Sequence, residues 1–579
     1  MKINDVEKIT GLTGKAIRLY ESKGLINISR DTNGYRNYSD NDIEVLKAIK
    51  LLRSIDASVA DIKLYLCGVI SIEELVDKRK TQILKESGKN TEKYRICESI
   101  VNNSPNKESD NVEFTEKEEI KTHKNGALSV GIDIGTTTVS AVVYDIDNKE
   151  QLEAYSIPHS SYIFSDIKYE QNTSAIINKS EKLLYHILDS YKNIISIGIT
   201  GQMHGIVYVN ENGEAVSNLM NWQDKRADQP LESGKSTCEE IFHMTGESIS
   251  TGYGVATHYY NMKMGEIPYN AVGICTIMDL FAMKICGTKK VLTHTSVASS
   301  LGMFDIEKSE FMKDKLSLIG IDVGFLPSVT GESITIGECR KIPVSVPIGD
   351  NQASFLGSVC NNGESILVNI GTGSQVSAVS DYRKVYGDIE IRPLIEGKYL
   401  ICGSALCGGY AYSMLEEFFR SYALSMGMQD ISQYNTINRI ASDAYEKGEK
   451  GLLVDVSFFG KRSDPCARGF IKNIDRQSFT PSALIIGVLK GMCNELYELY
   501  GAFNDRKTSI VASGGAVKKN EVLKKLIAER FGMTVDVNTV EEEAATGVAL
   551  FSALAAGKIK YNSGFSEYIR YTKRGLNNE

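Results

Sequence analysis

The feature that most constrains the fold is a strand–turn–strand pattern that occurs twice in the chain. The first copy is SVGIDIGTTTVSAVVYD, residues 129–145, and the second is SILVNIGTGSQVSAVSD, residues 365–381. In each copy a Gly-Thr turn interrupts a run of apolar and β-branched residues, which predicts two strands joined as a β-hairpin. We therefore predict two hairpins of one kind, far apart in the sequence.

The turns of these hairpins have the chemistry of a phosphate site. Glycine lets the backbone approach a phosphate closely, threonine hydroxyls and backbone N–H groups bond its oxygens, and a neighbouring acid can hold Mg²⁺. For one copy alone an ordinary glycine turn is an equal alternative, and the second copy favours nucleotide binding. The expected ligands are Asp133 for the metal and, for the phosphates, Gly135, Thr136, Thr137, Gly371, Thr372 and Gly373.

Neither hairpin has the GxxxxGK[ST] spacing of a P-loop, so that interpretation is excluded. The pair resembles the two phosphate loops of the actin-like ATPases instead. In that fold two similar α/β domains face each other across a cleft, and each contributes one hairpin to the nucleotide. The resemblance implies a two-domain α/β fold.

Length and composition set the broad class. A chain of 579 residues is too long for one core and predicts three or more domains. The start lacks a basic-then-apolar signal and no apolar run reaches the roughly 18 residues of a membrane span, so we expect a cytoplasmic protein. Eleven cysteines without C-x-x-C pairing predict neither disulfides nor zinc. A formal net charge of −8 argues against non-specific coating of nucleic acid, but a small DNA-reading surface remains compatible with it.

The first 70 residues have a pattern of their own. VEKITGLTGKAIRLYESKGL, residues 6–25, gives two short helical patterns around Gly11, which predicts a helix-turn-helix. Thr13 can cap the second helix, whose polar face would carry Lys15 and Arg18 toward bases and phosphates.

A wing follows this helix-turn-helix. Asn33-Gly34 is a strong hairpin signal, flanked by Arg36 and Tyr38, and Ser39 can cap the next helix. AIRLYESKGL followed by NGYRNYS closely resembles the MerR family of transcription regulators over residues 1–70. The alternative is a small helical domain with a solvated basic face, since basic residues exceed acids by only about two here.

The MerR resemblance implies binding to a specific DNA operator. The expected DNA contacts are Lys15, Arg18, Arg36 and Tyr38. Residues 71–126 would supply a dimerisation helix and a polar linker, so a homodimer is implied. The usual MerR effector end is missing.

Two motifs in the body have the composition of a sugar site. GQMHG, residues 201–205, ends a predicted strand, and W-x-D-x-R follows with the single tryptophan of the chain. Strand ends in α/β proteins carry ligands, although a lone His or Trp is more often a core residue. The expected sugar-binding residues are Gln202, Met203, His204, Trp222, Asp224, Arg226 and Asn351.

An acidic element comes next. VSVPIGDNQASFLGSV, residues 344–359, places Asp350 at a Gly-Asp turn between a strand and a helix. Phosphoryl transfer to a hydroxyl needs a carboxylate that orients the acceptor and takes its proton, with Mg²⁺ to neutralise the phosphate. The motif resembles that of the FGGY carbohydrate kinases, which implies that Asp350 is the base and second metal ligand. Alone, it could equally be a turn residue that caps a helix.

Together these motifs resemble the FGGY carbohydrate kinases, in family order, over about 450 residues. The resemblance implies an ATP- and Mg²⁺-dependent kinase whose halves span residues 127–358 and 359–579. In the second half, Gly514 and Gly515 would lie against adenine with Asn520 nearby.

GDNQAS at 349–354 and TGYGVATHYY at 251–260 look most like the sedoheptulokinases, which makes sedoheptulose the first candidate substrate. Xylulose or another ketose is the alternative. A second hypothesis is a transcription regulator whose kinase body serves as a sugar sensor. The two activities can coexist in one chain.

Overall fold

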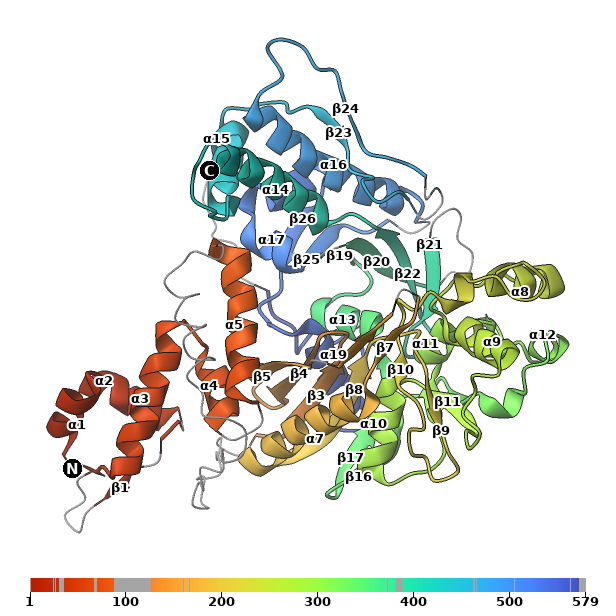
Figure 1. The fold of residues 1–579 in the computed structure, drawn as a ribbon, viewed down its shortest axis with the longest axis horizontal. Helices are drawn as coiled ribbons and strands as arrows, with labels where there is room; N and C mark the ends of the chain where they lie inside the picture. Colours follow the sequence, from red (N-terminus) through yellow and green to blue (C-terminus); the bar gives the residue numbers. More distant parts are fainter. Residues whose placement is uncertain are drawn as a thin grey trace.

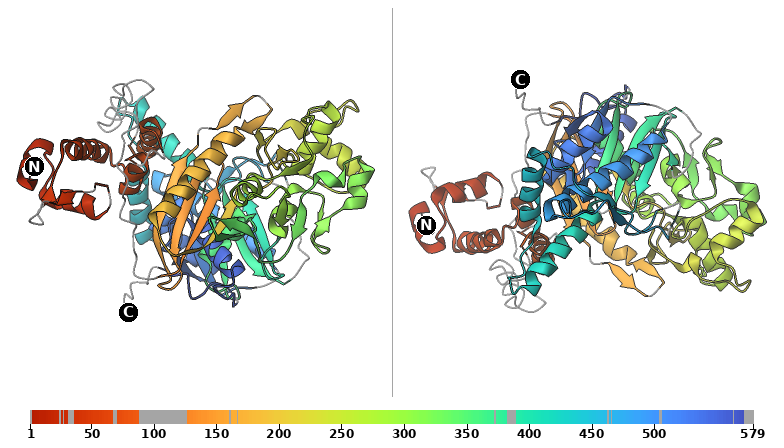
Figure 2. Two further views of the ribbon diagram at one scale, coloured as in Figure 1. Left: turned by 90° about the horizontal axis from the view of Figure 1, so that it is seen from below. Right: turned by 90° about the horizontal axis from the view of Figure 1, so that it is seen from above.

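The structure is a computed structural model of the chain (Figures 1 and 2). It describes the following residues: 2–23, 25–26, 28–30, 36–66, 70–87, 126–159, 161–165, 167–371, 373–381, 389–461, 464, 466–503, 506–562 and 564–571. The described part comprises a helical head, two α/β lobes and a smaller region beside the first lobe. No helix within these ranges is long and apolar enough to cross a membrane.

The head contains the predicted helix-turn-helix. The Thr13 side chain accepts a hydrogen bond from the Ala16 N–H, and Ser39 forms a capping box with Asp42, so both predicted caps are confirmed. The predicted Asn33-Gly34 turn lies outside the described residues, but two short antiparallel strands flank it. The elements of the head are α1 (Ile3–Thr10), α2 (Gly14–Ser22), β1 (Ser29–Arg30), β2 (Arg36–Asn37), α3 (Asp40–Ser54), α4 (Val59–Leu66) and α5 (Ile72–Ser87).

The head touches the first lobe at the edge of its sheet. Lys78 on α5 donates a hydrogen bond to the Ser156 carbonyl, and Glu74 pairs with Lys179. A lysine on an unpaired strand edge satisfies a backbone acceptor and blocks further pairing there. In Figure 1, α4 and α5 stand beside β5. Two residues of the expected dimer seam, Leu75 and Val76, are already buried within the single chain.

Lobe I is built on a seven-stranded sheet in the order β16-β17-β8-β3-β4-β5, with β18 also paired to β8. The first predicted hairpin is β3–β4, which is confirmed as an antiparallel pair. The strands are β3 (Leu128–Ile134), β4 (Thr138–Asp145), β5 (Glu150–Pro158), β8 (Ile194–Gly201), β16 (Thr335–Cys339), β17 (Ile342–Ser345) and β18 (Ile348–Gly349). The helices against it are α7 (Thr173–Ser190), α10 (Ile277–Cys286), α13 (Asp350–Ser358) and α19 (Glu543–Ala555).

The two faces of β3 are covered by different helices because successive side chains of a strand point to opposite faces. Val130 and Ile132 pack in one core with residues of α7, whereas the Ser129 hydroxyl donates to the Ala549 carbonyl of α19 at 2.7 Å. Gly131 faces α19 so closely that a Cβ would fall 1.8 Å from the Ala545 carbonyl oxygen. A helix from the C-terminal end of the chain thus covers the sheet of the first lobe.

The smaller region forms its own core beside lobe I, on the right of Figure 1. Its short strands are β6 (Tyr162–Phe164), β7 (Tyr169–Gln171), β9 (Val207–Val209), β10 (Leu219–Met220), β11 (Gly273–Cys275), β12 (Leu292–His294), β13 (Phe304–Asp305), β14 (Glu310–Phe311) and β15 (Ser328–Thr330). Its helices are α8 (Thr237–Thr245), α9 (Gly254–Met264), α11 (Thr295–Ala298) and α12 (Lys313–Leu318), with short 3₁₀ turns at Arg226–Asp228, Ser299–Leu301 and Val323–Phe325.

Lobe II repeats the arrangement of lobe I. Its sheet has the order β21-β22-β20-β19-β25-β26, and the second predicted hairpin is the antiparallel pair β19–β20. The strands are β19 (Ser365–Ile370), β20 (Ser374–Ser380), β21 (Ile389–Pro393), β22 (Tyr399–Ala405), β25 (Ser509–Ser513) and β26 (Thr534–Val537), with a separate pair β23 (Leu453–Asp455) and β24 (Phe470–Lys472). The helices are α14 (Gly409–Ser425), α15 (Tyr434–Glu446), α16 (Pro481–Gly501), α17 (Gly515–Lys519) and α18 (Glu521–Phe531).

Candidate active site

Three parallel strands of lobe I end at one edge of the sheet. Gly201, at the end of β8, lies opposite Ile134 of β3 and opposite Gly349 of β18. Gly135 and Asp350 follow those two partners, so they emerge at the same edge about two strand spacings, or about 10 Å, apart. This edge therefore brings together three expected parts of the site. They are the turn at residues 135–137, called the first phosphate turn because it is expected to bind phosphate, the GQMHG motif and the expected base.

Asp350 is the first residue of α13, directly after β18, as the Gly-Asp turn predicted. Its Oδ1 accepts hydrogen bonds from the Asn351 backbone N–H at 2.6 Å and from the Asn351 side-chain amide at 3.2 Å. Burial raises the pKa of Asp350 above that of an exposed aspartate. A carboxyl with a raised pKa at a strand end has the character of a proton acceptor in catalysis.

Asp133 lies on the α19 face of β3. Burial raises its pKa to about 8, and the charges of Asp350 and Glu542 add to this rise. Asp133 Oδ1 is buried and has no hydrogen-bond partner within the described part of the chain. A buried carboxylate with an unpartnered oxygen beside another acid suits a divalent cation, which oxygen ligands bind. Glu542, just before α19, was not predicted from the sequence.

The turn between β3 and β4 is braced by side chains from three other segments. The Gly135 carbonyl lies 3.0 Å from His159 Nε2, and the Thr136 carbonyl accepts from Gln171 Nε2 at 2.8 Å. Trp222 Nε1 donates to Thr136 Oγ1 at 3.1 Å, whereas Thr137 is exposed. The backbone that would meet a phosphate is thus held by hydrogen bonds that the sequence motif did not reveal.

The GQMHG motif joins this turn to the base. Gln202 Nε2 donates to Gln171 Oε1 at 3.0 Å, beside the phosphate turn. Met203 packs against Gly349, where a Cβ would fall 2.8 Å from its sulfur. His204 has a φ of 71°, and its Nδ1 lies 2.7 Å from the Ser300 carbonyl.

The His204 ring also stacks on Tyr253, with ring centroids 4.5 Å apart and an interplanar angle of 22°. Tyr253 immediately precedes α9, in the segment 251–260 that resembled the sedoheptulokinases. The stacking and the hydrogen bond to Ser300 hold the imidazole in one orientation.

Two of the expected sugar ligands direct their polar atoms into the protein. Asp224 Oδ1 accepts from Arg226 Nε at 2.8 Å, and both residues are buried. Arg226 also donates to Glu170 at 2.7 Å and to Asn261 at 2.8 Å. This ion-pair network ties the segment after β10 to β7 and α9, and so it supports Trp222, whose side chain is exposed.

The lobe II turn and the start of α17 bring together four of the expected nucleotide ligands. β19 and β25 run in parallel with Asn369 opposite Ser513, which places Gly514 beside the end of β19. Gly514 has a φ of 90°, and a Cβ there would fall 2.4 Å from the Ile370 carbonyl oxygen, so only glycine fits. Gly371 is exposed and its carbonyl accepts from the Gly409 N–H at 2.8 Å. Gly373 follows on the same turn, and Gly515 begins α17.

Two other expected ligands of this lobe are not assembled in the same way. Asn520 caps α18, since its Oδ1 accepts from the Leu523 N–H at 2.9 Å and its Nδ2 donates to Asn438 at 3.2 Å. Thr372 lies outside the described residues.

Comparison with known proteins agrees with this geometry. The FGGY family of carbohydrate kinases matches with its N-terminal domain at residues 128–357 and with its C-terminal domain at residues 368–556. The chain belongs to the FGGY carbohydrate kinases. The MerR HTH family of regulatory proteins matches residues 1–68, so this FGGY kinase carries a MerR-type head.

Individual relatives of this FGGY kinase are distant. A sedoheptulokinase from Mus musculus is 23% identical over 477 residues, which cover 73% of this chain and 96% of the relative. A xylulose kinase from Staphylococcus xylosus is also 23% identical, over 74% of this chain and 91% of the relative.

Among solved structures, the gluconate kinase from Lactobacillus acidophilus aligns with a TM-score of 0.67 at 18% identity, over 77% of this chain and 93% of that one. The glycerol kinase from Plasmodium falciparum with ADP aligns with a TM-score of 0.62 at 18% identity, over 76% and 91%. These likenesses support the two-lobed FGGY fold.

The head of this FGGY kinase presents part of the expected DNA surface. Lys15 and Arg18 are exposed on α2, one turn apart. Arg36 Nε donates to Glu21 at 2.7 Å, which ties the wing to α2. Tyr38 was expected to contact DNA, but its side chain is only 2% exposed and belongs to the core of the head, so its ring faces the interior.

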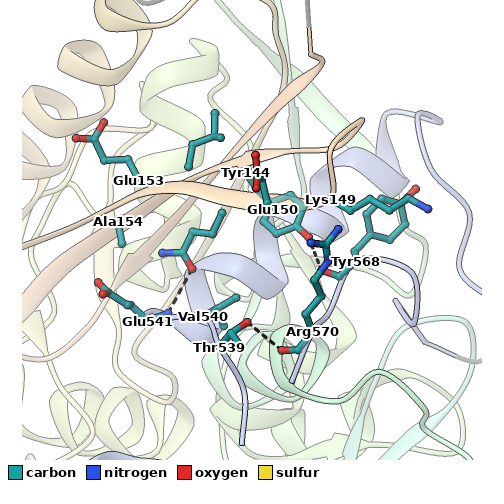
Figure 3. A pocket seen from close by; sticks show the side chains of 12 residues that line it. Tyr144, Lys149, Glu150, Glu153, Ala154, Thr539, Val540, Glu541, Tyr568 and Arg570 are labelled. Carbon is teal, nitrogen blue, oxygen red and sulfur yellow. Dashed lines mark hydrogen bonds between the residues drawn. The ribbon is translucent and has the colours of Figure 1, made fainter. Parts of the chain in front are cut away.

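A hollow of about 470 Å³ lies away from this edge of the kinase sheet (Figure 3). It is lined by the far ends of β4 and β5, by the segment between β26 and α19, and by Tyr568 and Arg570. Its charges are mixed, because its lining includes Lys149 and Arg570 as well as Glu150, Glu153 and Glu541. It sits at the opposite end of β4 from the phosphate turn and is separate from the active site.

Proposed function

We propose that this FGGY kinase transfers the γ-phosphoryl group of ATP to a hydroxyl of a ketose, with sedoheptulose as the first candidate. The observation that carries the proposal is the convergence of the first phosphate turn, the GQMHG motif and Asp350 at one sheet edge. Similarity to sedoheptulokinases at 23% identity supports the choice of sugar, and xylulose or another ketose is the alternative.

In the proposed reaction Asp350 accepts the proton of the attacking hydroxyl. The raised pKa that burial gives this carboxyl makes it a better base than an exposed aspartate. The two glycine turns hold the phosphates from opposite lobes, and His204, fixed by Ser300 and Tyr253, offers a hydrogen bond to the sugar. Water is excluded when the lobes close on both substrates.

Mg²⁺ fits the residues present. Asp133 Oδ1 is buried without a partner among the described residues, and the pKa of Asp133 is raised to about 8 by burial and by its acidic neighbours. Asp133 and Asp350 would hold the ion. When bound, it supplies positive charge that neutralises phosphate oxygens.

The test is a coupled ADP-release assay of the full chain with sedoheptulose, xylulose, ribulose, fructose and glycerol. We expect sugar-dependent ADP release that is highest with sedoheptulose and falls about 10²–10⁴-fold in Asp350→Asn, because the amide cannot accept the proton. Asp189→Asn, an exposed acid of lobe I, is the matched control. ADP release with none of the sugars would contradict the proposal.

The head supports a second function, binding of a specific inverted-repeat operator as a homodimer. Lys15 and Arg18 are exposed on the helix that a helix-turn-helix uses for base contacts. A binding selection with the full chain should enrich one repeat, and Arg18→Ala should relax that preference. Arg36→Ala should weaken all sequences alike and reduce the salt slope by about one.

If no sequence is enriched over random DNA, the head is not a regulator. If DNA is bound while every sugar fails in the ADP assay, the kinase body is a sensor. Binding of sugar to Asp350→Asn, measured by calorimetry, distinguishes a sensor from a body that does not recognise sugar at all.

A further inference from the structure

A strand of lobe II reaches the base of lobe I. β21 is an edge strand of the lobe II sheet, and it packs against α11 of the smaller region beside lobe I. Gln352, in the first turn of α13, donates from Nε2 to the Pro393 carbonyl at 2.9 Å. The residue before Pro393 is Arg392, so its side chain starts close to the turn that presents Asp350.

Only part of the Arg392 guanidinium forms hydrogen bonds with described residues of the protein. Its Nε and Nη2 donate to Glu390 Oε2 at 3.1 and 2.6 Å. Its Nη1 is buried and has no hydrogen-bond partner in the described part of the chain. Buried donors without partners are rare and costly in folded proteins, and they point to a missing acceptor.

The free end of Arg392 lies among residues of the expected sugar site. Burial raises the pKa of Asp350, and the nearby Arg392 charge opposes that rise. Tyr253, which stacks on His204, also interacts electrostatically with the Arg392 guanidinium. Gln202 Oε1 and Gln352 Oε1 are further buried acceptors without partners among the described residues. Unsatisfied donors and acceptors thus gather around Asp350.

Strand register separates Arg392 from the phosphate turn of its own lobe. Arg392 lies opposite Leu400 of β22, and Leu400 lies opposite Val379 of β20. Val379 is five residues beyond Ser374, where β20 leaves the Gly371–Gly373 turn, and that is about 17 Å along the strand. Arg392 therefore lies remote from the second phosphate turn, while its charge interacts with Asp350 and Tyr253.

We propose that Arg392 is a sugar-binding residue whose Nη1 donates a hydrogen bond to a substrate oxygen near the hydroxyl that is phosphorylated. This inference rests on the proposed kinase function. The expected sugar ligands come from lobe I and from the smaller region beside it, whereas Arg392 comes from lobe II. A bound sugar would then bridge the lobes and favour their closure.

The class of ligand follows from the donor. Because Glu390 accepts hydrogen bonds from Nε and Nη2, the guanidinium is fixed and its Nη1–H can recognise an oxygen acceptor at one position. The substrate should therefore be a polyol chain with an oxygen next to its reacting end. Because Glu390 neutralises the positive charge, a neutral hydroxyl or ring oxygen suits the site better than a free carboxylate.

The test compares full-length wild type, Arg392→Met and Arg392→Lys, with Arg439→Met as control. Arg439 is an exposed lobe II arginine that pairs with Asp443. KM and kcat are measured for the best sugar of the ADP assay, and ADP affinity is measured by calorimetry. Arg392→Met should raise KM for the sugar about 10- to 100-fold, the loss expected for a hydrogen bond from a charged donor, with ADP affinity unchanged. Arg392→Lys should recover part of this loss.

The outcomes separate the inference from its premise. If the sugar KM of Arg392→Met stays within twofold of wild type, or if sugar and ADP affinity fall together, Arg392 does not bind sugar. A lower kcat at unchanged KM would assign it to the transferred phosphoryl group and overturn the proposal as well. If Arg392→Met does not fold by circular dichroism, the KM of Arg392→Lys decides. If wild type phosphorylates no sugar, the proposed function fails and the inference fails with it.

Discussion

The two phosphate turns of this kinase share an architecture and differ in charge. In each lobe an antiparallel hairpin, β3–β4 or β19–β20, has a first strand that also pairs in parallel with a later strand, β8 or β25. The penultimate residue of that first strand is Asp133 in lobe I and Asn369 in lobe II. One duplicated frame thus carries an acid in one lobe and an amide in the other.

This difference indicates a division of labour between the lobes. The charges of Asp350 and Glu542 raise the pKa of Asp133, which supports our proposal that lobe I carries the cation and the proton acceptor. Asn369 lies against Gly514, where an added Cβ would fall 2.8 Å from its Oδ1, so the amide lines the backbone that is expected to meet the nucleotide. A carboxylate at position 369 would repel phosphates there.

The largest effect should come from Asp133→Asn, which gives both lobes an amide at this position of the hairpin. The amide is a poor ligand for Mg²⁺, so we expect turnover to fall by about 10² or more, since the ion supplies several kcal/mol of charge stabilisation. The measurement is kcat across a Mg²⁺ titration. The reciprocal Asn369→Asp should instead weaken ATP binding. Equal effects of both variants on kcat and on ATP affinity would contradict the division of labour.

The same pair of variants should differ in the pH dependence of stability. Burial raises the pKa of Asp133 from an ordinary value of 3.8 to about 8, so between these values the folded protein keeps a proton that the unfolded chain loses. Without divalent cation, the free energy of unfolding should therefore fall as pH rises from about 4 to about 8, by one to a few kcal/mol.

Asp133→Asn removes this dependence, so its melting temperature should exceed that of wild type by an amount that grows from pH 5 to pH 8 in EDTA. If the carboxylate of Asn369→Asp is buried, that variant should show the opposite trend, with a melting temperature that falls further below that of wild type as pH rises. A melting difference for Asp133→Asn that does not change with pH would exclude a protonated Asp133. Asp189→Asn, at an exposed site, controls for net charge.

The sequence predicted the features that repeat or that end strands, because these depend on local pattern. Both hairpins, the place of Asp350 and the caps at Thr13 and Ser39 follow from residues within a few positions of one another. Asn520 shows the limit of such reasoning, since an Asn just before a helix is itself a cap signal. The structure shows that cap at α18, and a role of Asn520 near adenine stays a prediction.

Long-range partners could not be predicted. Asp224 and Arg226 look like sugar ligands until Glu170 and Asn261, on distant segments, are seen to take their hydrogen bonds. Arg392 carries no motif, and its position beside Asp350 depends on the register of three lobe II strands. Tyr38 belongs to a basic, aromatic segment but packs in the core. It follows the two-residue strand β2, which is too short for the alternation of side chains to predict the direction of Tyr38.

A smaller effect on ATP binding should distinguish a glycine that lines the expected nucleotide site from a glycine that packs against another part of the protein. A Cβ at Gly371 would come no closer than 4.0 Å to the Gly373 carbonyl oxygen, so Gly371→Val leaves the fold intact. The branched side chain would instead intrude on the phosphates and weaken ATP binding by about 1–3 kcal/mol. Calorimetry with ATP and with sugar checks that only the nucleotide is affected. Gly131→Ala, which would overlap the α19 backbone, should lower the melting temperature, and a similar loss in Gly371→Val would contradict this interpretation.

The smallest effect concerns the contact between the lobe I turn and the W-x-D-x-R segment of the expected sugar site. Trp222 Nε1 donates to Thr136 Oγ1 at 3.1 Å, which links the W-x-D-x-R segment to the first phosphate turn. Thr136→Val keeps the shape of the side chain and removes the acceptor, so sugar affinity should fall by about 0.5–1.5 kcal/mol, the usual net contribution of one hydrogen bond.

Because Trp222 is the single tryptophan and its side chain is 46% exposed, its fluorescence reports on this contact directly. In wild type, ATP bound at the turn should change the emission through Thr136, and Thr136→Val should reduce that change. Thr335→Val, at an exposed position on β16, is the matched control. An emission change on ATP binding that is the same in wild type and Thr136→Val would show that the phosphate turn and the sugar side are not coupled through this hydrogen bond.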